Sequence, residues 1–365
     1  RCAGRVRRMD RPDHAGRRES TATPVELRLD ASRHLTPWLH ERQLSFAFST
    51  YQAGKLFMIG TDDRGDLSVS ERTFSRCMGL YPSGESLWMA SQFQVWRLEN
   101  SIPRGARHDG FDALYVPRVG YTTGDLDVHD IAVGRDGKPV FVSTAFSCVA
   151  TLSERFSFKP LWRPDFVSAL VPEDRCHLNG LAMRDKKPRY VTAVSRSDVA
   201  EGWRDARRAG GVVIDMDSNE VIAHGLSMPH SPRWHKDRLW LHNSGTGEFG
   251  YVIPGEGEFV PVVFIPGYAR GLAIHNGFAL VGMSRPRHGS SFSGLALDDE
   301  LRSRNAEAQV GVQLIDLARG VVVASLRISG YVEELFDVAW LPSVARPTLL
   351  GFKSDAILHT ITIDQ

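Results

Sequence analysis

The sequence predicts an all-β fold, a single β-propeller, and two observations support this prediction. Apolar runs are short, about four to seven residues, and Gly, Pro, Asp and Asn separate them, which is typical of strands joined by turns. A strand–turn–strand pattern also recurs along the chain at a period that suits propeller blades.

The recurring unit begins with a small or polar pair, followed by a short apolar strand, a turn and a second apolar strand. Six such openings align at Gly79, Asp130, Gly180, Pro232, Gly271 and Asp337. Their spacings, about 39 to 66 residues, match blades with insertions. A seventh opening, LSFAFSTYQAGKLFMIG, fits the pattern near residue 45. We therefore expect seven four-stranded blades, with six as the alternative.

The final unit shows only three strands, FDVAWL, TLLGF and ILHTITI. The isolated segment VELRLD near residue 25 would supply the missing outer strand and close the ring, which removes exposed sheet edges. We therefore expect a propeller closed by an N-terminal strand. A β-sandwich or a pair of small barrels is the alternative, but neither requires repeated openings at this period.

The propeller domain is expected to span residues 25–365. Residues 1–24 are basic and polar and are expected to form a disordered tail, because they cannot bury enough apolar surface to order themselves. Helical segments are expected only at residues 30–43, 199–210 and 295–308.

Composition indicates an ordinary soluble protein, with 24% charged residues and a formal net charge of +1. This balance gives no basic surplus for nucleic acid, and no apolar stretch is long enough to span a membrane. The four cysteines form no CxxC pair, so we expect reduced thiols in a cytoplasmic protein.

Histidines stand at the start of three successive units. His129, His177 and His230 immediately precede or begin the strand that would line the central channel, so residues from different blades should converge at one mouth. Neutral imidazoles suit a divalent transition metal such as Fe, Cu, Mn or Zn, and Asp337 is the expected fourth ligand, with Glu334 as the other candidate. Alternatively, Asp337 caps a blade turn and each histidine is a packing residue.

Four further polar residues of the openings are expected to bind a substrate. Arg270 or Arg233 would hold an anionic group through two hydrogen bonds. Asn179 and Glu334 would contact the substrate or fix the imidazole tautomers. The expected occupant of the channel is a small molecule or a peptide. Without a metal, the same histidines would act as general acid or base.

Several segments resemble a bacterial family of conserved hypothetical proteins, and they are STYQAGKLFMIG, RCMGLYPSGESLWMASQFQVWRLEN, HLNGLAM and MPHSPRWH. The resemblance extends from about Leu35 onward, and some members of that family are attached to tetratricopeptide repeats. This resemblance implies a propeller-like fold, but it does not indicate any particular activity. The sequence is also distantly similar to gluconolactonase-type propellers. Those hold a divalent metal through carboxylate and Asn ligands, so a mainly histidine set departs from their pattern.

Two functions therefore remain open. One is a metal-dependent oxidoreductase or hydrolase that acts on a small molecule or peptide. The other is a non-catalytic propeller scaffold that binds proteins or ligands, because propellers host many unrelated functions. A quinone-dependent dehydrogenase is a third reading that no residue specifically demands. The position of the histidines distinguishes the first two functions, since a site requires convergent rings and a scaffold does not.

Overall fold

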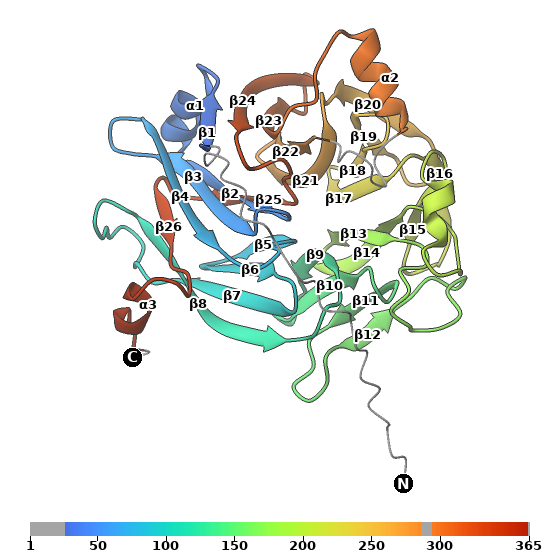
Figure 1. Ribbon diagram of the computed structural model, residues 1–365, viewed down its shortest axis with the longest axis horizontal. Helices are drawn as coiled ribbons and strands as arrows, with labels where there is room; N and C mark the ends of the chain where they lie inside the picture. The colour runs from blue at the N-terminus through green and yellow to red at the C-terminus, as the bar shows by residue number, and fades with distance from the viewer. Residues whose placement is uncertain (1–25, 286–293, 364–365) are drawn as a thin grey trace, which may run out of the picture.

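The structure is a computed structural model that describes residues 26–285 and 294–363. Within these ranges the strands form six sheets around a central axis (Figure 1). The predicted β-propeller is confirmed, and the expected count of seven blades is wrong, because the described strands form six. The predicted tail, residues 1–24, lies outside the described residues.

Each blade begins with the strand nearest the axis. Blade 1 consists of β25 (Val338–Pro342), β2 (Leu44–Thr50), β3 (Lys55–Thr61) and β4 (Leu67–Thr73). Blade 2 consists of β5 (Leu80–Ser83), β6 (Ser86–Ala90), β7 (Gln94–Asn100) and β8 (Ala113–Thr122), with β26 (Pro347–Leu349) at its outer edge. Blade 3 consists of β9 (Val128–Val133), β10 (Pro139–Ser143), β11 (Cys148–Thr151) and β12 (Lys159–Trp162).

The other half of the ring is built in the same way. Blade 4 consists of β13 (Leu178–Arg184), β14 (Lys187–Ala193), β15 (Gly211–Asp215) and β16 (Val221–Leu226). Blade 5 consists of β17 (Pro229–His235), β18 (Arg238–Asn243), β19 (Glu248–Val252) and β20 (Phe259–Phe264). Blade 6 consists of β21 (Tyr268–His275), β22 (Phe278–Ser284), β23 (Gly311–Asp316) and β24 (Val321–Ser329), with β1 (Arg28–Ala31) at its outer edge.

The innermost strands of the six blades follow one another around the axis in the order β5, β9, β13, β17, β21 and β25, each in contact with the next, and β25 contacts β5 (Figure 1). All six aligned openings of the sequence lie at or beside the start of these strands. The repeat in the sequence therefore located the strands that line the channel.

The ring is closed by the C-terminal strand β25, which pairs antiparallel with β2, with Trp340 opposite Phe46. The seventh opening and the final unit are thus parts of one blade, which explains the overcount. Every residue of β2 is buried, so its sequence looks like an innermost strand although it is the second strand of blade 1.

The expected closure by the N-terminal segment VELRLD is therefore wrong. Its strand β1 pairs with β24 at the outer edge of blade 6, with Arg28 opposite Ser329. The expected outer strands of the final unit also differ. β26 pairs in parallel with β8 of blade 2, and the last segment forms the short helix α3 (Ala356–His359).

Helices fall in the three expected segments, as α1 (Leu35–Arg42), the 3-10 helix η1 (Gly202–Ala206) and α2 (Ala296–Ser303). Helix α1 buries Leu35 and Leu39 against the core between blades 6 and 1. Among the described helices, none has the length and apolar character needed to cross a membrane.

The hydrophobic core is divided into clusters between neighbouring blades, because each sheet packs its faces on the sheets beside it. The close approach of blades 4 and 5 shows how tight this packing is. A Cβ atom at Gly180 would lie 2.2 Å from Cδ of Pro232, so a larger residue would push these two blades apart.

The innermost strands of blades 3 to 6 each contain a register shift near their start. In blade 4 the extra residue is Asn179, and in blade 6 it is Gly271, whose φ is +76°. Such bulges leave a residue outside the ladder and redirect side chains, and they are common beside functional sites. The residues expected to form the site surround these bulges.

Candidate functional site: a histidine cluster at the axis

The structure brings the three expected histidines together from blades 3, 4 and 5. The ring centroids of His129 and His177 are 5.0 Å apart, with an angle of 81° between the rings. The centroids of His177 and His230 are 6.5 Å apart. The three rings therefore form one cluster, which we call the histidine cluster.

The hydrogen bonds of His129 determine its tautomer. Its Nδ1 lies 3.1 Å from the backbone oxygen of Asp127 and 2.8 Å from Oγ1 of Thr144. The Thr144 hydroxyl donates its own hydrogen to the backbone oxygen of Leu178, at 2.6 Å. Both neighbours can thus only accept from the imidazole, so Nδ1 carries the hydrogen and Nε2 is an acceptor.

His230 has the same tautomer for the same reason. Its Nδ1 donates to the backbone oxygen of Met228 at 2.8 Å. Its Nε2 lies 3.3 Å from the amide nitrogen of Asn179, which donates to it. The orientation of this amide is fixed, because Oδ1 of Asn179 accepts from the Thr192 hydroxyl at 2.7 Å. Asn179 therefore contacts the histidine cluster through His230, and its expected contact with a substrate stays a prediction.

His177 is held by a carboxylate. Its Nδ1 lies 2.9 Å from Oδ2 of Asp174, and Nε1 of Trp203 donates to the same oxygen at 2.8 Å. The Trp203 ring lies against the imidazole, with the centroids 4.3 Å apart. His177 itself has a φ of +50°, an uncommon conformation for a residue with a Cβ, which costs free energy and recurs at functional sites.

Burial keeps two of the imidazoles neutral. Desolvation lowers the pKa of His129 to about 3, although the Asp127 carboxylate opposes this shift. Desolvation, followed by the positive charge of Arg270, lowers the pKa of His230 well below its usual value. At neutral pH these rings are therefore hydrogen-bond acceptors at Nε2 rather than cations.

The histidine cluster retains some access to solvent. The exposed fractions of His129 and His177 are 8% and 7%, whereas His242, on the second strand of blade 5, is fully buried. Among the described residues, no hydrogen-bonding group lies within reach of Nε2 of His129 or of His177. Nε2 of the neutral His129 ring is thus an acceptor without a partner among the described residues.

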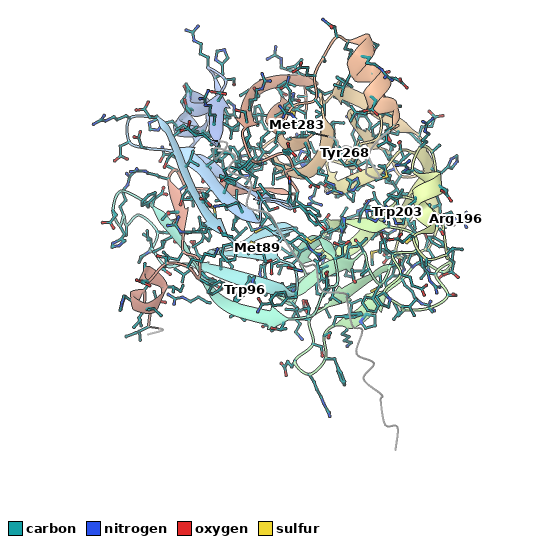
Figure 2. The ribbon with its side chains drawn as sticks, in the orientation of Figure 1. Met89, Trp96, Arg196, Trp203, Tyr268 and Met283 are labelled. Atoms are coloured by element: carbon teal, nitrogen blue, oxygen red, sulfur yellow. The ribbon has the colours of Figure 1, made fainter. Side chains whose placement is uncertain are left out.

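Arg270 and Glu334, both expected to contact a substrate, pair with each other. Nη1 of Arg270 lies 3.1 Å from Oε1 of Glu334, and both side chains are buried. The guanidinium carbon of Arg270 lies 4.9 Å from the ring centroid of Phe336 and 5.5 Å from that of Tyr268. Figure 2 labels Tyr268 of β21 and Trp203 of η1, two of the aromatic residues around the histidine cluster.

Asp130 and Asp337 connect neighbouring blades. Oδ2 of Asp130 accepts the backbone N–H of Leu181 in blade 4, and Oδ2 of Asp337 accepts that of Leu80 in blade 2. Burial raises the pKa of Asp337 to about 7. Asp337 therefore caps a neighbouring strand, which is the alternative role that the sequence allowed.

Arg233, expected to hold an anionic substrate, binds carboxylates of the protein instead. Its Nη1 lies 2.8 Å from Oδ2 of Asp130, and its Nη2 lies 3.8 Å from Oδ1 of Asp337. The interactions of the described residues place Asp337 with Arg233 and not with the three imidazoles.

The expected metal ligands were compared with the geometry that a metal requires. In residues 26–285 and 294–363, no group of three or more His, Cys, Asp or Glu side chains has the arrangement of a metal site. The cluster offers a local reason, because the Asn179 amide occupies the Nε2 lone pair of His230 that a metal would need. The metal remains a prediction.

Sequence reasoning missed Asp174, Trp203 and Thr144. Asp174 stands three residues before His177, and a left-handed backbone at both residues brings their side chains together. Asp–x–x–His is too common a spacing to show this on its own. Trp203 belongs to an insertion whose folding onto the mouth has no sequence signal, and Thr144 is one of many hydroxyl residues after a strand.

Comparison with known proteins places the chain in a family. A family model described as a domain of unknown function, DUF4915, matches residues 33–350. The chain belongs to the DUF4915 family. The match includes all three histidines of the cluster and every strand of blades 1 to 6 except the outer strand β1. No curated protein matches this DUF4915 chain.

Solved structures resemble the fold of the DUF4915 chain at low sequence identity. A chain from a nidogen/laminin complex matches with a TM-score of 0.52 and 12% identity, over 82% of this chain and 99% of that one. A protein of unknown function from Bacteroides caccae matches with a TM-score of 0.48 and 11% identity, over 82% and 98% of the two chains. Virginiamycin B lyase from Staphylococcus aureus matches with a TM-score of 0.40 and 10% identity, over 83% and 99%. At such identities the first similarity shows the fold alone.

Proposed function

We propose that the protein binds a small polar molecule at the histidine cluster and acts on it by general acid–base catalysis, with His177 as the proton-transferring group. The observation that carries this proposal is the pairing of His177 Nδ1 with the Asp174 carboxylate, at 2.9 Å. This pairing fixes the imidazole in the tautomer whose Nε2 accepts a proton.

The proposed step is a proton transfer. An O–H or N–H bond of the bound molecule breaks, its proton forms a new bond to Nε2 of His177, and the electron pair stays on the molecule's oxygen or nitrogen. Asp174 stabilises the imidazolium that results, since it already accepts the hydrogen of Nδ1. His129, whose Nε2 is an acceptor, orients the molecule beside the base.

The test begins with a screen of untagged protein against hydrolase and lyase substrates. The turnover of any substrate that is converted is then measured for substitution variants. Replacing His177 by Gln should lower the turnover rate by about 10²- to 10⁴-fold, which is the range of general acid–base catalysis. Asp174→Asn should lower it as well and alter its pH profile. His224→Gln is the matched control, because His224 is exposed and outside the cluster. Unchanged turnover in His177→Gln would rule out the proposed base.

A metal-dependent oxidoreductase or hydrolase is the second candidate, and the shared tautomer favours it. All three imidazoles donate Nδ1–H to a protein oxygen, as histidine ligands of metals commonly do, and each keeps Nε2 as acceptor. His129, His177 and His230 would hold Fe, Cu, Mn or Zn once the Asn179 amide turned away. Elemental analysis of untagged protein should then find a metal that His129→Ala and His230→Ala both remove. Metal content that is unchanged by both substitutions would exclude this candidate.

The convergence of the three rings supports a ligand site over a protein-binding scaffold, since a scaffold has no need of clustered polar groups at its axis. The proposed occupant is a small molecule or a short peptide segment, and protein partners are the alternative. A cytoplasmic location is also part of the proposal. Cys77, Cys148 and Cys176 are free thiols in the structure, which suits a reducing compartment.

A further inference from the structure

We infer that the histidine cluster selects ligands that donate hydrogen bonds and carry no negative charge, such as polyols or amines, and rejects carboxylates and phosphates. This inference deepens the proposed function and rests on it, because it names the class of molecule that the same site takes. It reverses the expectation from sequence that Arg270 or Arg233 receives an anion.

The first step of the argument concerns the imidazoles. His129 and His177 each donate Nδ1–H to the protein, and Nε2 is left as a lone-pair acceptor. A molecule at this position must therefore supply O–H or N–H groups.

The second step concerns the two arginines. Arg270 is paired with Glu334 at 3.1 Å, and Arg233 lies between Asp130 and Asp337. An anion would have to displace a buried carboxylate from one of these cations and leave that carboxylate without its partner. Such a loss is strongly unfavourable in a buried setting.

The third step concerns the remaining carboxylates. Oδ2 of Asp127 lies 3.6 Å from Nδ1 of His129, and Oδ2 of Asp174 lies 2.9 Å from Nδ1 of His177. The carboxylate of Asp174 thus stands behind His177, and that of Asp127, which also lies 3.8 Å from Nη2 of Arg76, stands behind His129. They repel an anion and strengthen hydrogen bonds that the imidazoles accept from a donor.

Two aromatic rings border the histidine cluster. Trp203 lies against His177, and Phe336 lies 5.2 Å from His129 between ring centroids. Both rings are almost fully buried, so they hold the imidazoles in place and keep water from their sides.

The test uses protein whose histidines carry ¹⁵N in the ring, observed by NMR, with four probes: myo-inositol, ethylamine, acetate and inorganic phosphate. In the wild type, myo-inositol or ethylamine should shift the Nε2 signals of His129 and His177. Phosphate and acetate should need at least about tenfold higher concentration for an equal shift. Equal or stronger shifts with the anions would overturn the inference, and so would the absence of any shift with both donor probes.

Removing the charge of Glu334 makes the test specific to Arg270. Glu334→Gln removes the carboxylate that neutralises Arg270, so this variant should gain phosphate binding by about tenfold. The matched control is Glu333→Gln, which removes the same charge from the neighbouring exposed position and should behave as the wild type. The double variant Glu334→Gln/Arg270→Gln should lose the gained binding. If Glu334→Gln gains nothing while its NMR spectrum remains that of a folded protein, Arg270 is not what excludes anions and the inference fails.

The two proposals can fail separately. If the donor probes bind as expected but His177→Gln leaves turnover unchanged, the assigned base is wrong and the ligand class stands. If His177→Gln abolishes turnover of an anionic substrate, the base stands and the ligand class is wrong.

Discussion

Arg233 of blade 5 reaches Asp130 of blade 3 through two hydrogen bonds, with Nη1 2.8 Å from Oδ2 and Nη2 3.2 Å from Oδ1. Its Nη2 also lies 3.8 Å from Asp337 of blade 1. One guanidinium thus joins three alternate blades at the axis. Because both carboxylates also accept backbone N–H groups of the following blade, this ion network ties the inner strands to one another.

The first prediction is that Arg233→Met strongly destabilises the ring. It leaves two buried carboxylates without their cation, so the free energy of unfolding should fall by about 3 to 5 kcal/mol, measured by urea denaturation. Adding Asp130→Asn to this variant should recover part of the loss, because it removes one unpaired charge. A loss that the second substitution makes larger would contradict the assigned role of Arg233.

The second prediction is a stability loss in acid that depends on His129. Its pKa is about 3 in the folded protein and 6.5 in an ordinary environment, so the unfolded chain binds the proton more readily. The contribution of His129 to the free energy of unfolding is fully present above pH 6.5. It falls by about 1.4 kcal/mol per pH unit as the pH drops toward 3. Denaturant unfolding should show a shallower acid slope in His129→Asn than in the wild type.

The comparison with the wild type is necessary because Asp337 acts in the opposite direction. Burial raises its pKa from 3.8 to about 7, so its contribution to stability falls as the pH rises between these values. His224→Gln, which replaces an exposed histidine, should leave the acid slope unchanged. A slope that is equal in the wild type and in His129→Asn would show that His129 does not titrate as a buried group.

The third prediction concerns Thr144, whose hydroxyl joins His129 of its own blade to the backbone oxygen of Leu178 in the next. Thr144→Val keeps the shape and removes both contacts, so the free energy of unfolding should fall by about 1 to 2 kcal/mol. Thr144→Ser retains the hydroxyl and should lose less. If the serine variant is as unstable as the valine variant, the lost methyl packing and not the hydroxyl is responsible.

The fourth prediction tests which strand closes the ring. Deleting residues 1–33 removes one described strand, the outer strand β1 of blade 6, and should leave a cooperatively folded protein. Deleting residues 334–365 removes the innermost strand β25 of blade 1 and should abolish cooperative unfolding, measured by circular dichroism. The reverse pattern would mean that the N-terminal strand closes the ring after all.

The sequence predicted the inner strands well and the blade count poorly, for one physical reason. The polar pair that opens each inner strand marks a bulge or a cap at the axis, which is a local feature, so Asp130, Gly180 and Gly271 were aligned correctly. Which strands share a sheet is a non-local property. The apolar run of β2 carries no sign that β25, at the other end of the chain, lies between it and the axis.

The candidate site, too, was predicted only in part from the sequence. The convergence of His129, His177 and His230 followed from the repeat, since equivalent positions of neighbouring blades lie close together. The partners of Arg270 and Arg233 did not follow, because each guanidinium finds its carboxylate on another blade. Sequence identifies groups that face an axis, and only the three-dimensional structure shows which of them neutralise each other.

The pairing of β2 with β25 also determines when this protein can fold during synthesis. Phe48 lies opposite Val338 in the completed sheet, so blade 1 stays incomplete until β25, which is made after every other described strand except β26, has left the ribosome. Until then, the buried face and hydrogen-bonding edge of β2 are open to other nascent chains, which is a hazard for aggregation. Joining the original termini and opening the chain at Gly84, an exposed turn between β5 and β6, would bring β25 and β2 closer in the order of synthesis. The same change would transfer the waiting edge to β6 of blade 2, because its partner β5 would then be made last.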